Sequence, residues 1–300
     1  MCIRDSYYPE MIRKYFGDGS RLGIEINYSY EKKLLGTAGG VKKAEKFFNN
    51  TFFVISGDGL TDIDLNEVLS FHRSKKAFAT MVLKRIDSKF EYGVTLTDKK
   101  GRIVKFLEKP SWGSIFANTV NTGIYVFEPE IFKFIPKNKF YDFGHQVWPE
   151  LLKRKKRIFG YITDSYWCDV GNITEYRSGQ KAALEKNVKV IVPGEEIKPG
   201  IWVDKGTKIE MGVKLKPPCV IGKNCYIGKK TVIGSYTTLG SGCKIGSSVN
   251  LKNCTLWNNV KINKNVQLNN CVISRGAVIN SSISVFDNAV ITVKRKSRYK

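Results

Sequence analysis

An aspartate directly after a predicted strand is the first candidate for chemistry in this sequence. Residues 52–56, FFVIS, are mostly apolar, β-branched or aromatic, and they end at Gly57 and Asp58. Such a run predicts a strand buried on both faces of a parallel sheet. Because ligands of open α/β sheets bind beyond the carboxyl ends of the strands, Asp58 is placed where chemistry usually takes place. Gly-Asp is also an ordinary turn dipeptide, so this stretch alone leaves both interpretations open.

A second aspartate, Asp169, lies in a comparable setting more than a hundred residues later. It follows the aromatic pair Tyr166-Trp167 and stands two residues before Gly171. A carboxylate in such a glycine-flanked turn can serve a ligand, or it can be a helix N-cap or turn residue. Residues 174–185 are expected to be helical, so the capping role stays open.

The segments around these aspartates alternate between strand and helix, the order expected of a parallel sheet covered by helices. Residues 92–127 differ, because their pattern predicts three strands separated by turns. The expected helices are Pro9–Phe16, 41–48, 66–72 with Asp64 as N-cap, 129–134, 144–153 and 174–185. The expected strands are 24–28, 52–56, 79–83, 92–97, 102–107, 121–127 and 158–162.

From Val203 onward the apolar pattern repeats every six residues. Six is neither a helical period nor a simple alternation, and a repeat of this length predicts a β-solenoid. We expect the aliphatic residue of each repeat to fill the interior, the following glycine to permit a turn, and a small residue two positions earlier to pack beneath. The aliphatic series is Val203, Ile209, Leu215, Ile221, Ile227, Ile233, Leu239, Ile245, Leu251 and Trp257, continued at five or six by Ile262, Leu268, Ile273, Ile279, Val285 and Ile291. The small residues are Cys219, Cys225, Thr231, Thr237, Cys243 and Val249, and the glycines are Gly222, Gly228, Gly234, Gly240 and Gly246.

The net charge of +23 invites a nucleic-acid hypothesis. The excess is spread along the chain, because residues 201–300 hold 17 lysines and arginines against 3 acids, and residues 1–200 hold 33 against 24. Lysines scattered among asparagines are more typical of a solvated surface than of a groove for DNA or RNA. We therefore expect no nucleic-acid partner.

The remaining composition describes an ordinary globular chain. Seven cysteines form no CxxC pair and only two histidines occur, so we expect free thiols and no zinc site. No apolar run approaches the roughly 18 residues that span a membrane, and the first residues lack the apolar core of a signal peptide. The cytoplasm is the default location.

Six short motifs, in this order and ahead of a hexapeptide array, resemble the sugar-1-phosphate nucleotidyltransferases, also called NDP-sugar pyrophosphorylases. The closest resemblance is to the mannose-1-phosphate guanylyltransferase type. It implies an α/β, Rossmann-like nucleotidyltransferase domain over residues 1–187, a linker at 188–200, a left-handed parallel β-helix at 201–293 and a basic tail at 294–300. The motifs are LGTAGG (35–40), VISGDGLTDIDL (54–65), EYGV (91–94), FLEKPSWG (106–113), VNTGIYVFEP (120–129) and YWCDVGN (166–172).

The resemblance implies transfer of a nucleotidyl group from an NTP to a sugar 1-phosphate, giving an NDP-sugar and pyrophosphate. The sugar-phosphate oxygen attacks the α-phosphorus in line, so positioning and charge neutralisation do most of the work. Asp58 and Asp169 match the family's two metal-binding aspartates, and Mg²⁺ takes one or two carboxylates while keeping several waters. GTP with mannose 1-phosphate is favoured, while dTTP or UTP with glucose 1-phosphate stays open.

The other motifs imply substrate contacts. Glu108 and Lys109 match the family's EKP motif, in which the acid binds sugar hydroxyls and the lysine, counted with the catalytic residues, pairs with the sugar phosphate. By themselves these two residues are equally a surface ion pair before a turn. The resemblance further places Gly36, Thr37, Ala38 and Gly57 on the nucleotide side, and Gly93, Asn121, Thr122 and Gly123 on the sugar side. Glycine in the GTA turn would let a planar base approach closely, although the turn is also an ordinary strand-to-helix connection.

One motif of the family is absent from the printed sequence. The family opens with a strand and the loop GxGTRL, followed by a lysine before a proline, which grip the triphosphate; nothing similar occurs here. We therefore expect the first domain to lack its first βα unit, by truncation or by real absence, and the chain as printed neither to bind NTP well nor to turn over. Some members continue into a phosphomannomutase-like domain, so a further domain beyond Lys300 is compatible with the resemblance.

Two rival functions follow from the same features. Hexapeptide solenoids often host acyltransferases, but these need a base within reach of the acceptor, and both histidines, His72 and His145, precede the solenoid. The second rival is a non-catalytic regulatory subunit that binds an NDP-sugar or a partner chain, against which the two metal-binding aspartates argue. Solenoid flanks commonly mediate assembly, which leaves a homo-oligomer open. His72 is expected to be an exposed helix residue.

Overall fold

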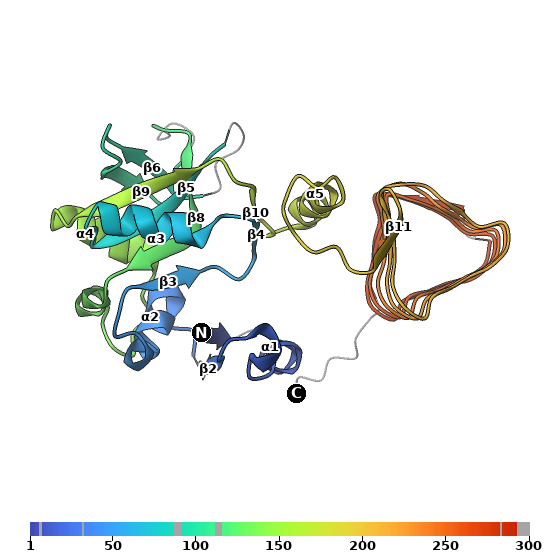
Figure 1. Cartoon of the computed structure of the whole chain (residues 1–300), viewed down its shortest axis with the longest axis horizontal. Helices are drawn as coiled ribbons and strands as arrows, with labels where there is room; N and C mark the ends of the chain where they lie inside the picture. Colours follow the sequence, from blue (N-terminus) through green and yellow to red (C-terminus); the bar gives the residue numbers. More distant parts are fainter. Residues whose placement is uncertain (6–7, 32, 87–91, 112–115, 283, 293–300) are drawn as a thin grey trace. The chain divides into compact units, whose positions relative to one another are not determined.

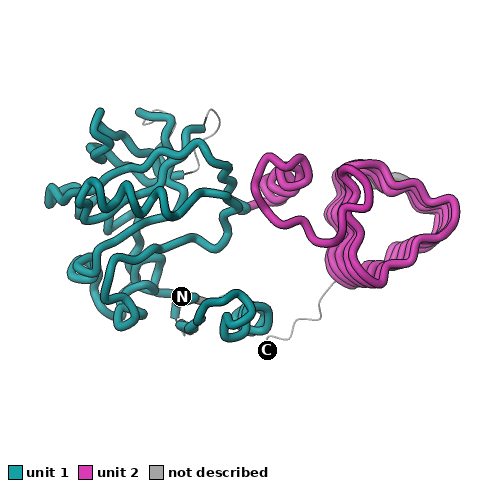
Figure 2. Tube along the Cα trace, in the orientation of Figure 1, with its two compact units in different colours: residues 1–170 teal, residues 171–300 magenta. Residues whose placement is uncertain are grey.

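The structure is a computed structural model that describes residues 1–5, 8–31, 33–86, 92–111, 116–282 and 284–292. It divides into two compact units, residues 1–170 and residues 171–300 (Figure 2). The domain boundary expected from the sequence is at residue 187, whereas the units divide after Val170, so the helix at 173–184 groups with the solenoid. Across the described ranges, no helix is long and apolar enough to cross a membrane.

A mixed six-stranded sheet forms the centre of the first unit (Figure 1). Its strands are β3 (Phe52–Ile55), β5 (Ala79–Arg85), β6 (Val94–Thr97), β7 (Ile103–Leu107), β8 (Thr119–Phe127) and β9 (Ile158–Thr163). They are ordered β7-β6-β8-β5-β9, with β3 also paired to β8. Strands β5 and β9 run parallel, and β3, β5 and β6 run antiparallel to β8. The parallel sheet expected from the alternation is therefore only partly present.

Shorter elements surround this sheet. The helices and helical turns are α1 (Pro9–Phe16), η1 (Ser20–Leu22), α2 (Gly36–Lys43), η2 (Glu45–Phe47), α3 (Leu65–Ser74), η4 (Pro129–Phe134), the π-helical turn η5 (Phe143–Val147) and α4 (Trp148–Lys153). Two small sheets pair β1 (Cys2–Asp5) with β2 (Asn27–Tyr30), and β4 (Gly59–Thr61) with β10 (Trp167–Asp169). Asp64 caps α3 as predicted, because its carboxylate accepts the Asn66 N–H at 2.8 Å.

Alternate residues of the central strands supply two halves of the core. In β8, Tyr125 and Phe127 pack with Trp148 and Met81 on one face, while Val126 packs on the other with α3, which lies across β5, β8 and β9 (Figure 1). This division follows the two-residue period of a strand. Burial of apolar side chains on both faces accounts for the near-continuous hydrophobic runs of the sequence.

Two local predictions for the first unit are wrong. Ile55, at the end of β3, is 48% exposed, because β3 pairs with β8 and with no other strand of the described chain. The GTAGG segment is not a loop ahead of a helix but forms the first turns of α2. Its N–H groups at Ala38 and Gly39 both donate to the Tyr141 carbonyl, at 2.9 and 3.0 Å, which satisfies amides that a helix start leaves open.

The prediction for His72 is also wrong, because its side chain is 1% exposed. Its Nδ1 lies 2.8 Å from the Thr80 hydroxyl and its Nε2 lies 3.0 Å from a Glu128 carboxylate oxygen. A neutral ring that carries its proton on Nε2 satisfies both contacts, since Nε2 donates to the carboxylate and Nδ1 accepts from the hydroxyl. Burial lowers the pKa of His72, and the hydrogen bond and charge of Glu128 oppose that shift in part.

Protonation of His72 therefore makes stability depend on pH. Since its pKa is lower in the folded chain than in the unfolded chain, the unfolded chain takes up this proton first, and stability falls as the pH drops below the usual histidine range. We expect the unfolding free energy to fall more steeply from about pH 7.5 to about pH 5.5 in the wild type than in His72→Gln. Urea unfolding at several pH values measures this. His145→Gln, which alters an exposed ring, is the matched control, and equal slopes in wild type and His72→Gln would contradict the burial argument.

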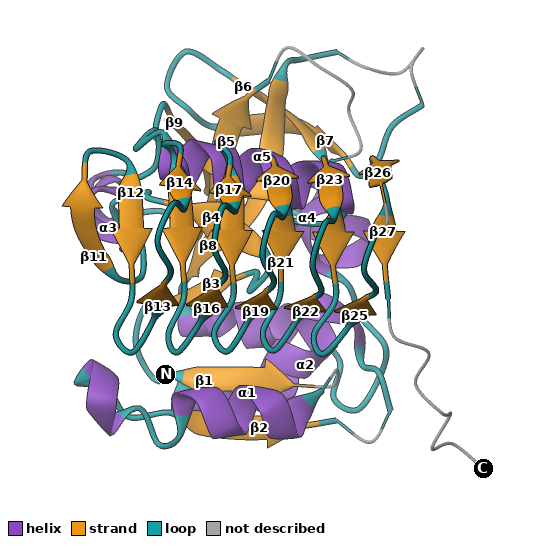
Figure 3. Ribbon diagram, turned by 90° about the vertical axis from the view of Figure 1, so that its right-hand side faces the viewer, coloured by secondary structure: helices purple, strands orange, loops and turns teal. Residues whose placement is uncertain are grey.

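The second unit is a solenoid of three sheets, parallel except where β11 joins β12 antiparallel, and its coils nearly superpose into a triangle in Figure 1 and lie side by side in Figure 3. Helix α5 (Ile173–Leu184) precedes it. The first sheet contains β11 (Glu195–Lys198), β12 (Ile201–Val203), β15 (Cys219–Ile221), β18 (Thr237–Leu239), β21 (Thr255–Leu256), β24 (Val272–Ile273) and β27 (Val290–Ile291). The second contains β13 (Lys208–Ile209), β16 (Tyr226–Ile227), β19 (Lys244–Ile245), β22 (Lys261–Ile262) and β25 (Val278–Ile279). The third contains β14 (Lys214–Leu215), β17 (Val232–Ile233), β20 (Asn250–Lys252), β23 (Gln267–Asn269) and β26 (Ser284–Asp287).

The predicted interior of the solenoid is confirmed for most of the repeat. All six small residues of the series are at most 2% exposed, and the aliphatic residues from Ile221 to Leu251 are buried beside them. Trp257 is an exception, since Leu256 takes the inward position and the indole is 46% exposed. Leu239 pairs with Leu256, 17 residues away, whereas Ile221 pairs with Leu239, 18 residues away. The coil between Leu239 and Leu256 is thus one residue shorter than the coil before it. This change of period comes before Trp257, whereas the sequence predicts it after Trp257.

The repeated glycines do not provide the turns, which corrects a second expectation. Left-handed backbone conformations occur instead at other positions, among them Asn224, Lys230 and Gly242. A Cβ added at Gly228 would lie 2.8 Å from backbone atoms of Gly246 and Ser247 in the next coil. These glycines are therefore required for close approach between neighbouring coils.

Gly228→Ala tests this role of the glycines. Because the added methyl would overlap backbone of the next coil, we expect the solenoid to lose about 1–3 kcal/mol of unfolding free energy. Chemical denaturation followed by far-UV circular dichroism measures the change, with the exposed neighbour Lys229→Ala as control. Equal stability of the two variants would show that the coils can separate at no cost.

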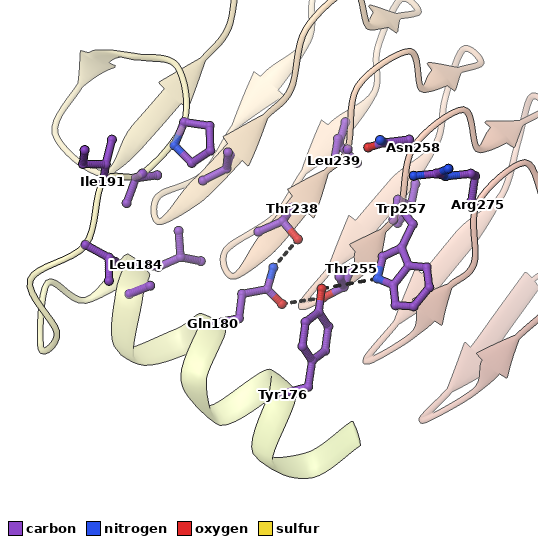
Figure 4. Close-up of a pocket in the computed structure, with 17 residues that line it drawn as sticks. Tyr176, Gln180, Leu184, Ile191, Thr238, Leu239, Thr255, Trp257, Asn258 and Arg275 are labelled. Atoms are coloured by element: carbon purple, nitrogen blue, oxygen red, sulfur yellow. Dashed lines mark hydrogen bonds between the residues drawn. The ribbon is translucent and has the colours of Figure 1, made fainter. Parts of the chain in front are cut away.

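Helix α5 is fastened to the first sheet of the solenoid by polar side chains (Figure 4). The Gln180 amide donates to the Thr238 hydroxyl and accepts from the Thr255 hydroxyl at 2.6 Å. Nearer the start of the helix, the Trp257 indole N–H lies 3.3 Å from the Tyr176 hydroxyl. The outward turn of Trp257 thus has a structural explanation in its contact with α5.

Candidate active site

The two predicted metal-binding aspartates are neighbours in the structure. Strands β4 and β10 pair antiparallel, so that Asp169 stands opposite Gly59 and the Val170 N–H donates to the Asp58 carbonyl at 3.0 Å. Asp58 is exposed and Asp169 is partly exposed. The backbones of two aspartates separated by 111 positions in the sequence are thus brought together beside the β4–β10 pair.

The loop that carries Asp58 is held against β8. The Ser56 N–H donates to the Gly123 carbonyl at 3.0 Å, and Gly123 has a positive φ of 75°. A Cβ at Gly123 would lie 2.7 Å from the Ser56 hydroxyl oxygen, so this close approach requires glycine. The predicted sugar-side residue Gly123 is therefore adjacent to the segment that ends at Asp58.

Other predicted sugar-side residues join the same region through β8. The Asn121 N–H donates to the Gly93 carbonyl at 2.8 Å, and the Asn121 side chain donates to the Tyr125 hydroxyl at 2.8 Å and accepts the Gly123 N–H at 2.9 Å. Thr122 points away, because its hydroxyl is buried and donates to the Val82 carbonyl at 2.9 Å. Only backbone of Thr122 is thus near the site, and its carbonyl accepts the Trp167 indole N–H at 3.1 Å.

Glu108, the predicted sugar-binding acid, is partly buried. Its Oε2 is buried and has no hydrogen-bond partner within the described residues. The carboxylate lies between two glycines, since a Cβ at Gly93 or at Gly144 would stand 2.7 or 2.4 Å from Oε2. Burial, reinforced by the charge of Asp142, raises the pKa of Glu108, while His145 and Lys109 oppose the shift.

The predicted nucleotide-side turn is packed more tightly than a binding loop would require. Gly36 and Ala38 are buried, and a Cβ at Gly36 would lie 2.5 Å from the Tyr141 carbonyl oxygen. Thr37 is exposed, and its hydroxyl donates to an Asp142 carboxylate oxygen at 2.6 Å. Lys109 is exposed beside Glu108. The motif residues Glu91, Trp112 and Gly113 lie outside the described residues.

The aspartate pair fits a hard divalent cation that keeps most of its water. No cluster of three or more histidine, cysteine, aspartate or glutamate side chains poised for a metal occurs among the residues that the structure describes. Mg²⁺ needs only one or two carboxylates when phosphate oxygens and water complete its shell, whereas zinc requires three or four protein ligands. Two carboxylates would therefore be a donor set that Mg²⁺ accepts.

A pocket of about 390 Å³ in the second unit is not part of this site. It lies between α5 and the first sheet of the solenoid and is lined by Leu184, Ile191, Trp257 and Arg275, among others (Figure 4). None of the predicted site residues borders it.

Comparison with protein families decides which chemistry this arrangement belongs to. A family described as nucleotidyl transferase matches residues 1–186, and a second one, described as the EIF2B subunit epsilon LbH domain, matches residues 198–296. The first match covers more than half of the chain. The chain belongs to the nucleotidyl transferase family. The second match agrees with the left-handed β-helix expected after residue 201.

Curated relatives of this nucleotidyl transferase act on several nucleotide and sugar pairs. A UTP–glucose-1-phosphate uridylyltransferase of Synechocystis sp. is 37% identical over 212 residues, which cover 66% of this chain and 55% of that protein. A mannose-1-phosphate guanylyltransferase of Mycobacterium tuberculosis is 38% identical over 176 residues, covering 58% and 48%. A D-glycero-alpha-D-manno-heptose 1-phosphate guanylyltransferase of Aneurinibacillus thermoaerophilus is 35% identical over 180 residues, covering 60% and 76%. The chain spans about half the length of the first two relatives.

A solved structure supports the fold of this nucleotidyl transferase. The Bacillus anthracis protein, described as a glucose-1-phosphate thymidylyltransferase in complex with sucrose, superposes with a TM-score of 0.55 at 20% identity. The match covers 64% of this chain and 78% of that one. Members of the family generally use a divalent metal ion.

Several residues near Glu108 escaped the sequence analysis. Gly144, just before α4, packs against the Glu108 carboxylate, and the side chains of Asp142, His145 and Tyr125 interact with it electrostatically. Burial raises the pKa of Tyr125 far above its usual value, so this hydroxyl stays protonated. Asp142 could have been found, because it stands two residues ahead of the predicted helix at 144–153, and an aspartate just before a helix is the usual N-cap signal.

Proposed function

We propose that this chain carries the catalytic chemistry of a sugar-1-phosphate nucleotidyltransferase, with GTP and mannose 1-phosphate as the favoured substrates. The observation that supports this most is the buried, unpaired Glu108 oxygen within a region that also holds Asn121 and the Asp58–Asp169 pair. A buried carboxylate oxygen without a donor is costly, and a ligand hydroxyl would remove that cost. Several guanylyltransferases for mannose 1-phosphate are among the relatives.

The proposed reaction is an in-line displacement at phosphorus. An oxygen of the sugar 1-phosphate forms a bond to the α-phosphorus of the NTP, and the bond from that phosphorus to the β-phosphate bridging oxygen breaks, so pyrophosphate leaves with the electron pair. Asp58 and Asp169 would hold Mg²⁺, which neutralises charge on the phosphates when bound. Glu108 would accept hydrogen bonds from sugar hydroxyls, and Lys109 would pair with the sugar phosphate.

Backbone groups would complete the sugar site. The Asn121 side chain is already committed to Tyr125 and to the Gly123 N–H, so Asn121 acts by holding the Gly123 backbone with its side chain and the Gly93 carbonyl with its own N–H. Gly57 leaves room beside Asp58 for a nucleotide phosphate, since no atom lies within 4 Å of a Cβ added there. Thr37 offers the exposed side chain of the predicted nucleotide turn.

Glu108→Gln tests the sugar site. Since a neutral amide accepts weaker hydrogen bonds than a carboxylate, we expect the Kd for mannose 1-phosphate to rise about tenfold. Isothermal titration calorimetry with mannose 1-phosphate and glucose 1-phosphate measures affinity and identifies the preferred sugar. Glu130→Gln alters an exposed glutamate of η4 and serves as control. If neither sugar phosphate binds the wild type in the presence of Mg²⁺, the proposed substrate class is wrong.

Asp58→Asn and Asp169→Asn test the metal pair. Each variant removes one carboxylate. Mn²⁺ is used as a paramagnetic substitute for Mg²⁺. Mutation of residues that only hydrogen-bond to metal ligands lowers metal affinity by roughly 10- to 100-fold, so we expect loss of a ligand itself to lower the Mn²⁺ affinity at least as much. Line broadening of amide resonances in β4 and β10 measures binding and its location. Asp164→Asn, whose carboxylate is fully exposed, is the control. If the broadening persists in both variants, the metal ion binds at another place.

Incubation with sugar 1-phosphate, NTP and Mg²⁺ tests the reaction itself. Formation of an NDP-sugar and pyrophosphate, with the best base and sugar identified by chromatography, supports transfer. Binding of GDP-mannose or UDP-glucose without turnover by the printed chain would favour the regulatory-subunit alternative.

A further inference from the structure

Asp142 connects the two predicted halves of the site, although no motif singled it out. Its carboxylate receives hydrogen bonds through both oxygens. Oδ2 accepts from the Thr37 hydroxyl at 2.6 Å, while Oδ1 accepts from the N–H groups of Gly144 and His145 at 2.9 and 3.3 Å. One side chain therefore contacts the GTAGG turn and also caps the π-helical turn η5.

The Thr37 hydroxyl makes two hydrogen bonds with the segment that contains Asp142. The Thr37 hydroxyl, which donates to Asp142, also accepts the Phe143 N–H at 2.9 Å. One residue earlier, the Tyr141 carbonyl accepts the N–H groups of Ala38 and Gly39. Residues 141–143 and the start of α2 are thus tied together by several hydrogen bonds, of which the one from Thr37 to Asp142 is the one whose acceptor also caps η5.

Asp142 is connected to Glu108 by the backbone of Gly144. A Cβ at Gly144 would lie 2.4 Å from Oε2 and 2.6 Å from the carboxyl carbon of Glu108, so the backbone of η5 is the wall against which this carboxylate lies. Asp142 fixes that wall by accepting the Gly144 N–H. The same carboxylate also places a negative charge near Glu108.

We propose that Asp142 is a positioning residue that locks the Gly36–Ala38 turn to the wall behind the Glu108 carboxylate, so that one side chain sets the predicted nucleotide turn and the predicted sugar-binding acid together. The ligand roles of the two halves rest on the proposed function; the lock itself rests on the hydrogen bonds and the Gly144 contact. A residue that only capped η5 would influence neither Thr37 nor Glu108.

Asp142→Asn separates these roles without disturbing the helix start. Asparagine is as good an N-cap as aspartate, so Oδ1 can still accept the Gly144 N–H. Its amide replaces the oxygen that accepts from Thr37, and its negative charge is lost. Thr37→Val removes the same hydrogen bond from the other side, and Thr37→Ser keeps the hydroxyl and is the conservative rescue.

The first measurement needs no ligand. The Glu108 carboxyl is titrated by carbon-13 NMR in the wild type and in Asp142→Asn. The titratable groups that influence Glu108 electrostatically are Asp142, His145 and Lys109, and Tyr125 is in turn influenced by Glu108. Because removal of a nearby negative charge favours the ionised form, the Glu108 pKa should move down in Asp142→Asn. An unchanged value would overturn the proposal.

The second measurement is the affinity for mannose 1-phosphate alone. Although Thr37 belongs to the predicted nucleotide side, we expect Thr37→Val and Asp142→Asn each to raise the Kd about tenfold, as loss of a hydrogen bond to a charged group does. The Kd of Thr37→Ser should stay within about twofold of the wild-type value. A general loss of folding would not produce this difference between the two Thr37 variants. Affinity that is unchanged in both Thr37→Val and Asp142→Asn would overturn the lock. If the wild type binds no sugar 1-phosphate, the proposed function fails, while the Glu108 titration still decides on Asp142.

Discussion

Strand β8 is the constraint on which the candidate site depends. Tyr125 and Phe127 enter one half of the core and Val126 enters the other, so a slip of one residue would exchange the two halves. The register of β8 is therefore fixed by packing. Because Asn121 holds Gly93, and Gly123 holds the end of β3, that register also fixes the place of the polar residues around Asp58. Core packing thus determines the geometry of the site.

The features that could be predicted from the sequence are those with local signals. Asp64 caps α3, and the six-residue period identifies the solenoid interior, because each is determined by neighbours in the chain. Trp257 was misplaced because a coil of 17 residues differs from one of 18 only in which of two adjacent apolar residues points inward. His72 was misplaced because Thr80 and Glu128, which make its burial tolerable, come from other parts of the chain.

For the site, motif resemblance located residues but not their surroundings. The adjacency of Asp58 and Asp169 depends on the pairing of β4 with β10, which no local pattern announces. The burial of Glu108 between Gly93 and Gly144 depends on η5, a π-helical turn that was expected to be ordinary helix. Such turns are frequent at functional sites, and here one brings Asp142 against both halves. Long-range placement of this kind follows from the fold, not from spacing.

The charges around Glu108 suggest how the site would discriminate between ligands. Lys109 and His145 favour its ionised form, while burial and Asp142 oppose it, so the carboxylate is not neutralised by one dominant partner. Its buried Oε2 has no hydrogen-bond partner among the described residues, which under the proposed function leaves it to a sugar hydroxyl. A site with an unpaired buried acceptor strongly rejects ligands that lack a hydrogen-bond donor. This discrimination is far larger than that of an apolar pocket between ligands that differ by one methylene. Selectivity for a hydroxylated ligand would therefore arise from burial of the Glu108 carboxylate. The Gly144 backbone maintains this burial, because it blocks rotation of the carboxylate toward that side.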